Sequence, residues 1–388
     1  MALPTMKIRL FPRAEATVRA GHPWVFADSV KSVNREGEAG ELAVVYDRQD
    51  RFMAVGFWEP ASPIPLRILH QGSPARIDRA WWVAQAMACR ERRAVVEGVG
   101  TTGFRCINGD SEGFPGLVAD RYGDTLVVKI YTSAWVSRWD EIEGVMREVF
   151  QPAHVVRRVA RNLDGVEEGF CGEPGAEVVV FQENGLRFES AVLHGQKTGF
   201  FLDQRDNRRR VGEMAGGRDV LNVFSFSGGF SVYAARGGAK SVTDVDISAH
   251  ALESAARNFS LNSDLAGTDH RRVQADAFKW MSDAADQWDL IVVDPPSLTK
   301  REREKTGALG AYRRLNSDAI RCLRRGGILV AASCSAHVRS AEFLSLVREE
   351  ARRSGRQWRE LWTHGHAADH PATFSEAEYL KAIAIEFG

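Results

Sequence analysis

The C-terminal half of the chain contains short, nearly uninterrupted apolar runs that alternate with segments of helical periodicity. A strand that is apolar on both faces has to be covered on both sides, so this alternation favours a buried, mostly parallel, doubly wound α/β sheet. We expect its strands at Asp219–Phe224, Ser241–Val245, Leu290–Val293 and Gly327–Ala332. The helices are expected at Phe230–Gly237, Ala249–Asn262, Leu315–Leu323 and Ser340–Ser354.

The residues before this half follow two other patterns, which predict two further domains. Residues 1–73 contain short apolar strands separated by polar turns, which indicates a compact β-rich domain. Residues 74–190 open with a helix over Ile77–Val99 and continue with strands on either side of a second helix near 137–150, which is typical of a small α+β domain. The doubly wound sheet then occupies residues 191–388.

Composition excludes several other classes of protein. Glycine and proline make up 48 of the 388 residues (35 Gly and 13 Pro), the share of an ordinary globular protein and not of a fibre or a disordered chain. No uncharged apolar run approaches the ~18 residues that span a bilayer, and no signal peptide is evident, so we expect a cytoplasmic protein without a membrane partner. The 51 basic and 51 acidic side chains balance, so any nucleic acid has to be bound by local patches.

The chain has five cysteines, which are odd in number and form no C-x-x-C pair: Cys89, Cys106, Cys171, Cys322 and Cys334. This pattern argues against a disulfide framework and a zinc finger, and we expect no metal site. Cys322 lies on an apolar helix face, where a cysteine usually acts as a small buried hydrophobe. Cys334 instead follows an apolar strand and lies between two serines, so we expect it to act as a nucleophile; the alternative is a packing role.

A glycine pair follows the first apolar strand, where the chain turns into a helix. Gly228 and Gly229 would let the backbone approach a ligand, and the helix N-terminus would offer free N–H groups. Asp246 ends the next strand, 24 residues after Asn222, close to the offset of about 20 residues at which an acid binds the ribose in nucleotide-binding βα units. We therefore expect an adenosine-type ligand; the alternative is a tight turn beside a surface acid. The sequence is not G-x-G-x-x-G, which disfavours a dinucleotide.

Two further acidic residues follow strands of the same predicted sheet. Asp294 is delivered to the carboxyl end of its strand, the edge at which open α/β sheets bind ligands. Pro295 and Pro296 follow it and lack N–H groups, so the carbonyls of this turn stay free to accept from a planar amino group. We expect Asp294 to belong to an active-site loop. Asp276 could reach an adenine amino group, although an aspartate there would serve equally well as a helix N-cap.

Charged segments lie on either side of these motifs in the sequence. Residues 194–210 are dense in polar and aromatic side chains, which a solvated helix face with an N-cap explains only in part. Residues 300–305, with Arg313 and Arg314, are expected to form a mixed-charge loop that could touch phosphates, although a charged run is usually a solvated surface.

At these residues the chain resembles the class I S-adenosylmethionine-dependent methyltransferases, and more closely the ribosomal large subunit methyltransferase I family, which makes 5-methylcytidine in 23S rRNA. The resemblance covers nearly the whole chain. Residues 21–26 (GHPWVF) are similar to the opening of the family's PUA domain, an RNA-binding β-barrel, and residues 116–124 (GLVADRYGD) are similar to its middle domain. The catalytic part is matched by Gly195–Arg208, Gly228-Gly229-Phe230, Asp294-Pro295-Pro296, Ser333-Cys334-Ser335, Asp369-His370-Pro371 and Glu378-Tyr379-Leu380-Lys381.

The resemblance implies a Rossmann-like methyltransferase domain at 191–388, a PUA-like domain at 1–73 and a small central α+β domain. It implies that S-adenosylmethionine is bound by Phe200, Asp203, Gln204, Arg205, Phe226, Ser227, Gly228, Gly229, Asp246, Ile247, Asp276, Ala277, Asp294 and Pro295. RNA contacts are implied for His22, Trp24, Arg208, Lys300 and Arg301. The implied partner is 23S rRNA or a large-subunit assembly intermediate, and the chain is expected to form a homodimer.

Three functions are compatible with these patterns. The first is methylation of cytidine C5 in RNA, with Cys334 as covalent nucleophile and Asp294 facing the base. The second is methylation of a base nitrogen, because the Asp-Pro-Pro turn is similar to the amine-binding turn of nitrogen methyltransferases; Cys334 would then be structural. The third is a catalytically silent RNA-binding protein that uses residues 1–73. Many RNA cytosine-5 methyltransferases carry a second cysteine after the Asp-x-Pro turn, where this chain has Ser297.

Overall fold

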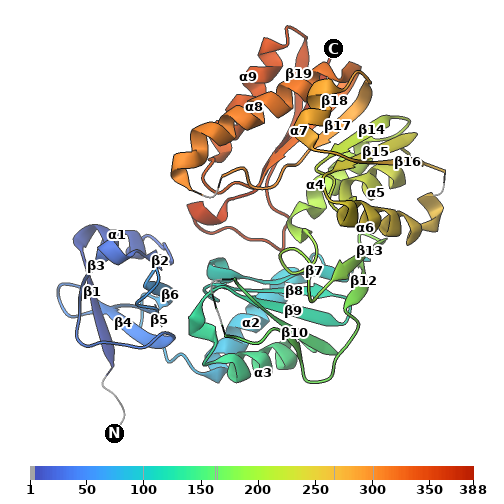
Figure 1. Cartoon of the computed structure of the whole chain (residues 1–388). Helices are drawn as coiled ribbons and strands as arrows, with labels where there is room; N and C mark the ends of the chain where they lie inside the picture. The colour runs from blue at the N-terminus through green and yellow to red at the C-terminus, as the bar shows by residue number, and fades with distance from the viewer. Residues whose placement is uncertain (1–4, 99, 162, 164, 266, 300) are drawn as a thin grey trace. The chain divides into compact units, whose positions relative to one another are not determined.

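The computed structural model describes residues 5–388 except 99, 162, 164, 266 and 300. The chain divides into two compact units (Figure 1). The first unit comprises the chain up to Gln182 together with 190–200 and 368–374, and the second comprises 183–189, 201–367 and 375–388. No helix in the described part of the chain is long and apolar enough to cross a membrane.

The first unit contains two sheets. The N-terminal sheet has the order β2-β6-β5-β4-β1-β3. Its elements are β1 (Met6–Leu10), α1 (Pro12–Arg19), β2 (Trp24–Val25), β3 (Val30–Val33), β4 (Glu41–Tyr46), β5 (Phe52–Trp58) and β6 (Leu66–Gln71). Its inward side chains, such as Ile8, Ala43 and Val45, alternate with more exposed ones, as expected for a sheet with one buried face.

The second sheet of this unit has the order β11-β10-β9-β8-β7 and is packed against two helices. Its elements are α2 (Arg79–Arg93), β7 (Gly103–Asn108), β8 (Leu117–Tyr122), β9 (Thr125–Ile130), α3 (Trp139–Phe150), β10 (His154–Val159) and β11 (Gly169–Cys171). A buried cluster of Trp82, Phe114 and Trp135 fills the space between the helices and strands, and Phe57 of β5 packs into it. β12 (Val178–Glu183) and β13 (Leu186–Ala191) form a two-stranded sheet.

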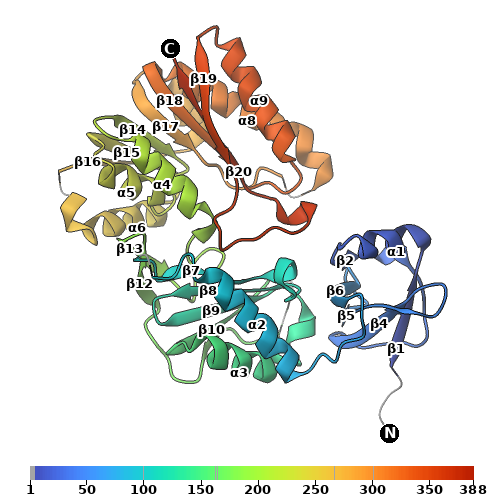
Figure 2. The same cartoon turned by 180° about the vertical axis from the view of Figure 1, so that it is seen from behind.

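The second unit contains a seven-stranded sheet of order β16-β15-β14-β17-β18-β20-β19 (Figure 2). The strands β16, β15, β14, β17 and β18 run parallel to one another, and β20 is antiparallel to both of its neighbours, β18 and β19. The strands are β14 (Asp219–Val223), β15 (Ser241–Asp246), β16 (Asp269–Gln274), β17 (Trp288–Val293), β18 (Leu323–Ser333), β19 (Trp358–His364) and β20 (Lys381–Phe387). The helices are α4 (Arg205–Met214), α5 (Gly229–Arg236), α6 (Ala249–Ser260), α7 (Ala277–Asp283), α8 (Lys305–Arg321) and α9 (Ser340–Arg353).

Both faces of this sheet are covered by helices, which confirms the doubly wound fold. Leu290 and Val292 of β17 join a cluster with side chains of α4 and α5, whereas Ile291 and Val293 join one with α7, α8 and α9. Alternate residues of one strand therefore enter two different cores, so the strand is apolar throughout.

One predicted helix and one predicted loop are wrong in this unit. α8 begins at Lys305 and not at Leu315, so Arg313 and Arg314 lie on a helix and not in a loop. Ala308, Tyr312 and Leu315 form the buried stripe that holds its first turns against the core. The mixed charge of this segment predicts a loop, whereas tertiary packing stabilises a helix there despite the low helix propensity of Gly307 and Gly310.

Candidate active site

The carboxyl ends of four parallel strands line one edge of the large sheet. The strands lie in the order β15-β14-β17-β18, and the chain leaves β14 on one side and returns to β17 on the other. The junction of β14 and β17 is therefore a topological switch point, where open α/β sheets bind ligands. The Gly228 turn follows β14, Asp246 ends β15, Asp294 follows β17 and Cys334 follows β18. The prediction that Asp294 and Cys334 follow adjacent strands is confirmed.

The turn after β14 has an uncommon backbone conformation. Phe224, Phe226 and Gly228 have positive φ angles of 61°, 48° and 72°, although the first two carry side chains. The N–H of Gly228 donates to the Ser225 carbonyl at 2.9 Å. A Cβ on Gly228 would lie 2.9 Å from the Cβ of Ala255 on α6. The glycine thus permits a close approach of turn and helix, and the positive φ angles are of the kind that cluster at ligand sites.

Asp246 has the position and the acceptor capacity to bind a ribose. Its Oδ2 accepts from the N–H of Phe226 and its Oδ1 from the N–H of Ser248, each at 2.9 Å. Each carboxylate oxygen has a further lone pair, so both can still accept from a hydroxyl of a diol. The adjacent Ile247 is 68% exposed, so an apolar side chain is accessible beside Asp246. These residues fit the adenosine part of S-adenosylmethionine, which carries its methyl group on a sulfonium.

A buried network of polar side chains from β14, α5, β15 and β16 lies next to this turn. The Asn222 amide donates to Ser231 Oγ at 2.9 Å and to Asp244 Oδ1 at 3.0 Å. The Nε2 of His270 lies 2.8 Å from Asp244 Oδ2, and its ring stacks on Phe259. Asp244 is completely buried, so these partners replace the water that its carboxylate has lost. Sequence reasoning did not find this network, because His270 follows Asn222 by 48 positions with no motif to join them.

Asp276 occupies the N-cap of α7, where its Oδ1 accepts from the N–H of Lys279 at 3.0 Å. The N-cap interpretation therefore describes its local structure, and adenine binding by this residue stays a prediction. Ala277 begins the helix and is buried.

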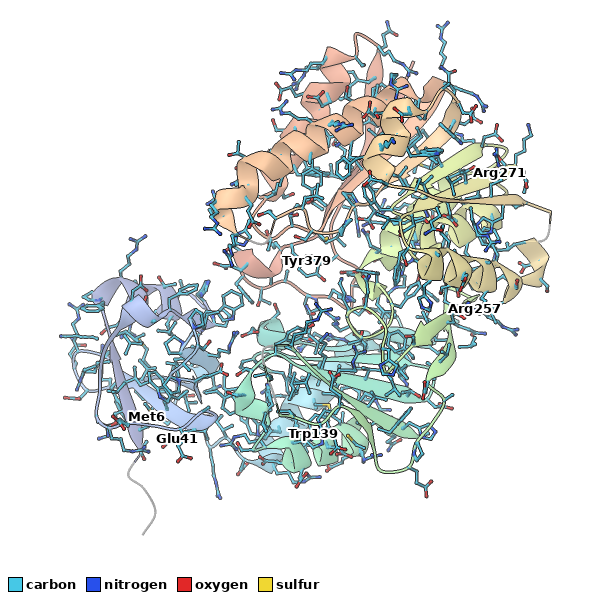
Figure 3. The ribbon with its side chains drawn as sticks, in the orientation of Figure 1. Met6, Glu41, Trp139, Arg257, Arg271 and Tyr379 are labelled. Atoms are coloured by element: carbon cyan, nitrogen blue, oxygen red, sulfur yellow. The ribbon has the colours of Figure 1, made fainter. Side chains whose placement is uncertain are left out.

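The segment 201–207 brings polar side chains to Asp294. Gln204 Nε2 donates to Asp294 Oδ2 at 2.8 Å, and Asn207 Nδ2 donates to Gln204 Oε1 at 2.6 Å. Asp203 is buried, and its Oδ2 accepts from the hydroxyl of Tyr379 at 2.7 Å. Tyr379 is labelled in Figure 3. This segment is thus fastened to the Asp294 turn and to the C-terminal segment at Tyr379.

The remaining predicted cofactor residues are distributed as follows. The Phe226 ring meets Phe201 edge-on at 5.1 Å, and the Ser227 carbonyl accepts from Asn258 at 2.8 Å. Arg205 is buried, with its Nε 3.8 Å from an Asp206 oxygen. Gly229 begins α5. Phe200 belongs to the first unit, where it packs on Phe181.

Cys334 is held between two serines that bind the same tyrosine. The Tyr312 hydroxyl lies 2.8 Å from Ser333 Oγ and 2.9 Å from Ser335 Oγ. Burial raises the pKa of Tyr312 to about 12, so the hydroxyl keeps its proton at neutral pH. The Cys334 thiol donates to the Pro295 carbonyl with an Sγ–O distance of 3.8 Å. Cys334 is half-buried and lies against the Asp294-Pro295 turn.

The other four thiols have raised pKa values. Burial raises the pKa of Cys89 to about 12 and also raises the pKa of Cys106, Cys171 and Cys322. A raised pKa lowers the fraction of thiolate, which is the nucleophilic form. Chemistry at any of these four thiols is therefore disfavoured.

The residues implied in RNA contact have different placements. In the first unit, Trp24 Nε1 donates to Asp110 at 2.7 Å, and the rings of His22 and Trp24 both meet Phe374 edge-on. Arg67 lies over the Trp24 ring at 5.5 Å and is paired with Asp110 at 3.2 Å, so its positive charge is compensated within this aromatic cluster.

In the second unit, Arg301 is exposed, and Lys300 lies outside the described residues. Arg208 is 3% exposed and its guanidinium forms two hydrogen bonds with Glu183, at 2.9 and 2.6 Å. A third bond runs from Arg208 to the Phe201 carbonyl at 2.8 Å. This geometry assigns Arg208 to the packing of the unit, because a phosphate would have to open a buried ion pair to reach it.

Comparison with known proteins agrees with the fold described above. A family model described as S-adenosylmethionine-dependent methyltransferase matches residues 146–359, and one for a PUA-like domain matches residues 8–71. A candidate SAM-dependent methyltransferase from Streptococcus mutans has the same fold, with a TM-score of 0.84 at 22% identity over 98% of this chain and 99% of that one. A solved structure of a candidate methyltransferase complexed with SAH gives a TM-score of 0.85 at 22% identity and the same coverage.

Curated relatives are similar over their whole length. The ribosomal RNA large subunit methyltransferase of Deinococcus radiodurans is 51% identical over 99% of this chain and 98% of the relative. The ribosomal RNA large subunit methyltransferase I of Shewanella amazonensis is 34% identical over 98% of both chains, and that of Aeromonas hydrophila is 32% identical over 97% and 98%. The chain therefore belongs to the ribosomal RNA large subunit methyltransferase I family, a family of S-adenosylmethionine-dependent enzymes with a PUA-like domain.

Proposed function

We propose that this enzyme methylates C5 of a cytidine in 23S rRNA and that Cys334 is the covalent nucleophile. The observation that supports it most directly is the contact between the Cys334 thiol and the Pro295 carbonyl, at 3.8 Å. This contact joins the turns that follow β17 and β18, so Asp294 and Cys334 both lie at this edge of the sheet. The names of the curated relatives support ribosomal RNA as the substrate.

A thiol nucleophile overcomes the low reactivity of cytosine C5 in this reaction. C5 of cytosine is a weak nucleophile, and attack of the Cys334 thiolate on C6 makes an enamine in which C5 becomes nucleophilic. C5 then takes the methyl group from the sulfonium of S-adenosylmethionine, whose S–CH3 bond breaks to leave S-adenosylhomocysteine. A base removes the C5 proton, and the electron pair of that C–H bond expels the thiolate from C6. Atoms and charge balance, and Cys334 returns to its starting state. The target base has to leave its stack or belong to an unpaired stretch of RNA.

Asp294 has the position to stabilise the ring during the attack. A carboxyl group hydrogen-bonded at N3 of cytosine would stabilise the charge that develops when C6 is attacked. The bond from Gln204 at 2.8 Å fixes the orientation of the Asp294 carboxylate at the carboxyl end of β17. Ser297, which stands where many RNA cytosine-5 methyltransferases have a second cysteine, bonds to the Thr299 carbonyl at 2.8 Å.

The proposal is tested with methyl-labelled S-adenosylmethionine and 23S rRNA from a strain that lacks this protein, followed by digestion to nucleosides. We expect label in 5-methylcytidine with the wild type and none with Cys334→Ala. Cys322→Ala is the matched control, because that thiol lies in the apolar core of the same unit, and we expect it to keep full activity.

Two other outcomes would contradict the proposal. Label in a methylated purine would favour the base-nitrogen reaction, in which Cys334 only packs. Undiminished 5-methylcytidine with Cys334→Ala would exclude the covalent mechanism but keep the substrate. Running the assay on naked 23S rRNA and on large-subunit assembly particles in parallel identifies the form of RNA that the enzyme accepts.

A further inference from the structure

Lys381 is a buried cation at the start of β20, beside β18, the strand that Cys334 follows. It pairs with Ser333 in the antiparallel register of β18 and β20, and it is 2% exposed. The rest of β20, Ala382–Phe387, is almost entirely apolar and buried. A lysine is almost never fully buried without partners, so its placement requires an explanation.

The ammonium group of Lys381 donates three hydrogen bonds to backbone carbonyls. Its Nζ donates to the carbonyls of Ser335 and Val338, each at 2.5 Å, and to that of Tyr379 at 3.1 Å. Two of these acceptors belong to the turn 334–339, which follows β18 and carries Cys334 as its first residue. Lys381 therefore ties this turn to β20.

The charge of Lys381 interacts with the thiol as well. Burial lowers the pKa of Lys381 to about 8, while the negative forms of Cys334 and Glu342 counteract that effect. The group is thus still mostly protonated at neutral pH, and its three carbonyl partners favour the charged form. The thiolate of Cys334 stabilises the charged form of Lys381. Because the interaction is mutual, the ammonium group of Lys381 also stabilises the thiolate.

We propose that Lys381 is a positioning residue for Cys334: its buried ammonium group fixes the turn that carries the thiol and favours the thiolate form. This inference rests on the proposed role of Cys334 as nucleophile. Lys381 itself is not the base that removes the C5 proton, because its three N–H groups are donated to carbonyls and the side chain is buried.

Other charged and titratable groups around this turn are few and can be separated from Lys381. Glu342 on α9 is paired with Lys305 at 2.8 Å, so its charge is largely compensated. The groups that face the turn are Tyr312 on α8, Asp294 after β17, His337 and Arg339 in the turn itself, Glu302, which lies 3.4 Å from His337, and the Glu342–Lys305 pair.

The test measures the alkylation of Cys334 by iodoacetamide between pH 5.5 and 9.5, in the full-length enzyme without RNA, with the modified peptide quantified by mass spectrometry. Alkylation follows the thiolate fraction, so its pH midpoint reports the pKa of the thiol. We expect Lys381→Met to move the midpoint upward by about one pH unit and to slow the reaction about tenfold at pH 7. A midpoint identical to that of the wild type would overturn the inference.

Arg356→Met is the matched control. Arg356 is also a cation that binds backbone carbonyls, those of Ile320, Leu323 and Arg324, but it lies at the opposite end of β18. We expect it to lower stability without moving the alkylation midpoint. Equal shifts from both variants would mean that loosening of the sheet, and not the charge of Lys381, controls the thiol.

Affinity for S-adenosylhomocysteine and cooperative thermal unfolding establish that each variant is folded. If Lys381→Met does not fold, Lys381→Gln, which keeps a donor but no charge, is measured against the same criterion. The alkylation assay involves no methyl transfer, so a negative result for Lys381 can be distinguished from a negative result for the proposed function. An unshifted midpoint with an inactive Cys334→Ala contradicts only the role of Lys381. A shifted midpoint with a fully active Cys334→Ala contradicts only the covalent mechanism.

Discussion

The side-chain amide of Gln204 donates to the carboxylate of Asp294 at 2.8 Å, across 90 positions of sequence. Gln204 is itself oriented, because its carbonyl oxygen accepts from Asn207 at 2.6 Å. Two consecutive hydrogen bonds, from Asn207 to Gln204 and from Gln204 to Asp294, thus connect the start of α4 with the turn after β17. It fixes the direction of the carboxylate at the point where we propose that the target base binds.

Replacing Gln204 by Met removes this bond while keeping a side chain of similar length. We expect kcat for RNA methylation to fall about 10- to 100-fold, because Asp294 would no longer be held in one orientation. Asn207→Leu acts only through Gln204 and is expected to lower kcat by a smaller factor. Single-turnover kinetics at saturating RNA and S-adenosylmethionine measure both. An equal loss in the two variants would mean that α4 has moved as a whole.

The parts of this site that the sequence predicts are those in which a local pattern reports the end of a strand. Asp294 and Cys334 each follow an apolar run, and parallel strands bring such ends to one edge. Gln204, Tyr312 and Lys381 belong to the same neighbourhood but reach it from α4, α8 and β20. Their contribution depends on the order and register of the strands, which no local periodicity encodes.

The fold shows the same division between local and distant information. The parallel strands β14, β15, β17 and β18 were predictable because they are largely apolar, as Leu290–Val293 is, whereas the parallel strand β16 is polar and mostly exposed. The antiparallel pair β19 and β20 was not identified, although β20 lies between β18 and β19. β20 begins with the charged residue Lys381, and a charged residue before an apolar run usually indicates the exposed end of a strand. Nothing in the local sequence therefore indicates that this lysine is buried.

Asp246 and Asp276 provide a direct comparison of two acids that follow neighbouring strands. Replacing Asp246 by Ala removes two acceptor oxygens from the proposed ribose contact, and we expect Kd for S-adenosylmethionine to rise about 10- to 100-fold. Asp276→Ala removes the α7 N-cap and is expected to cost about 1 kcal/mol of stability with a smaller rise in Kd. Isothermal titration calorimetry and chemical denaturation separate the two effects. A larger loss of affinity with Asp276→Ala would reverse this assignment.

Gly228→Ala places a methyl group in the turn beneath the proposed cofactor site. The new Cβ would lie 2.9 Å from Ala255 Cβ and 3.2 Å from Asp244 Oδ2, at a φ of 72°. Gly326→Ala is the matched control, since φ is 76° there but nothing lies within 4 Å. We expect the control to cost about 1 kcal/mol from backbone strain alone, and Gly228→Ala to cost more and to weaken S-adenosylmethionine binding. Equal stability of the two variants in urea denaturation would show that the turn can shift away from α6.

Arg208 and Arg209 are adjacent in sequence but differ in burial, and this difference separates a packing role from an RNA-binding role. Arg208 is ion-paired with the buried Glu183, whereas Arg209 is paired with the exposed Glu213. Removing one partner of a buried pair leaves a charge without compensation, so we expect Arg208→Met to lower the free energy of unfolding by about 3–5 kcal/mol. Arg209→Met is expected to cost less than about 1 kcal/mol. If Arg208 instead bound RNA, its replacement would leave the urea midpoint unchanged and weaken RNA affinity in a filter-binding assay, which is the opposite of what the buried pair predicts.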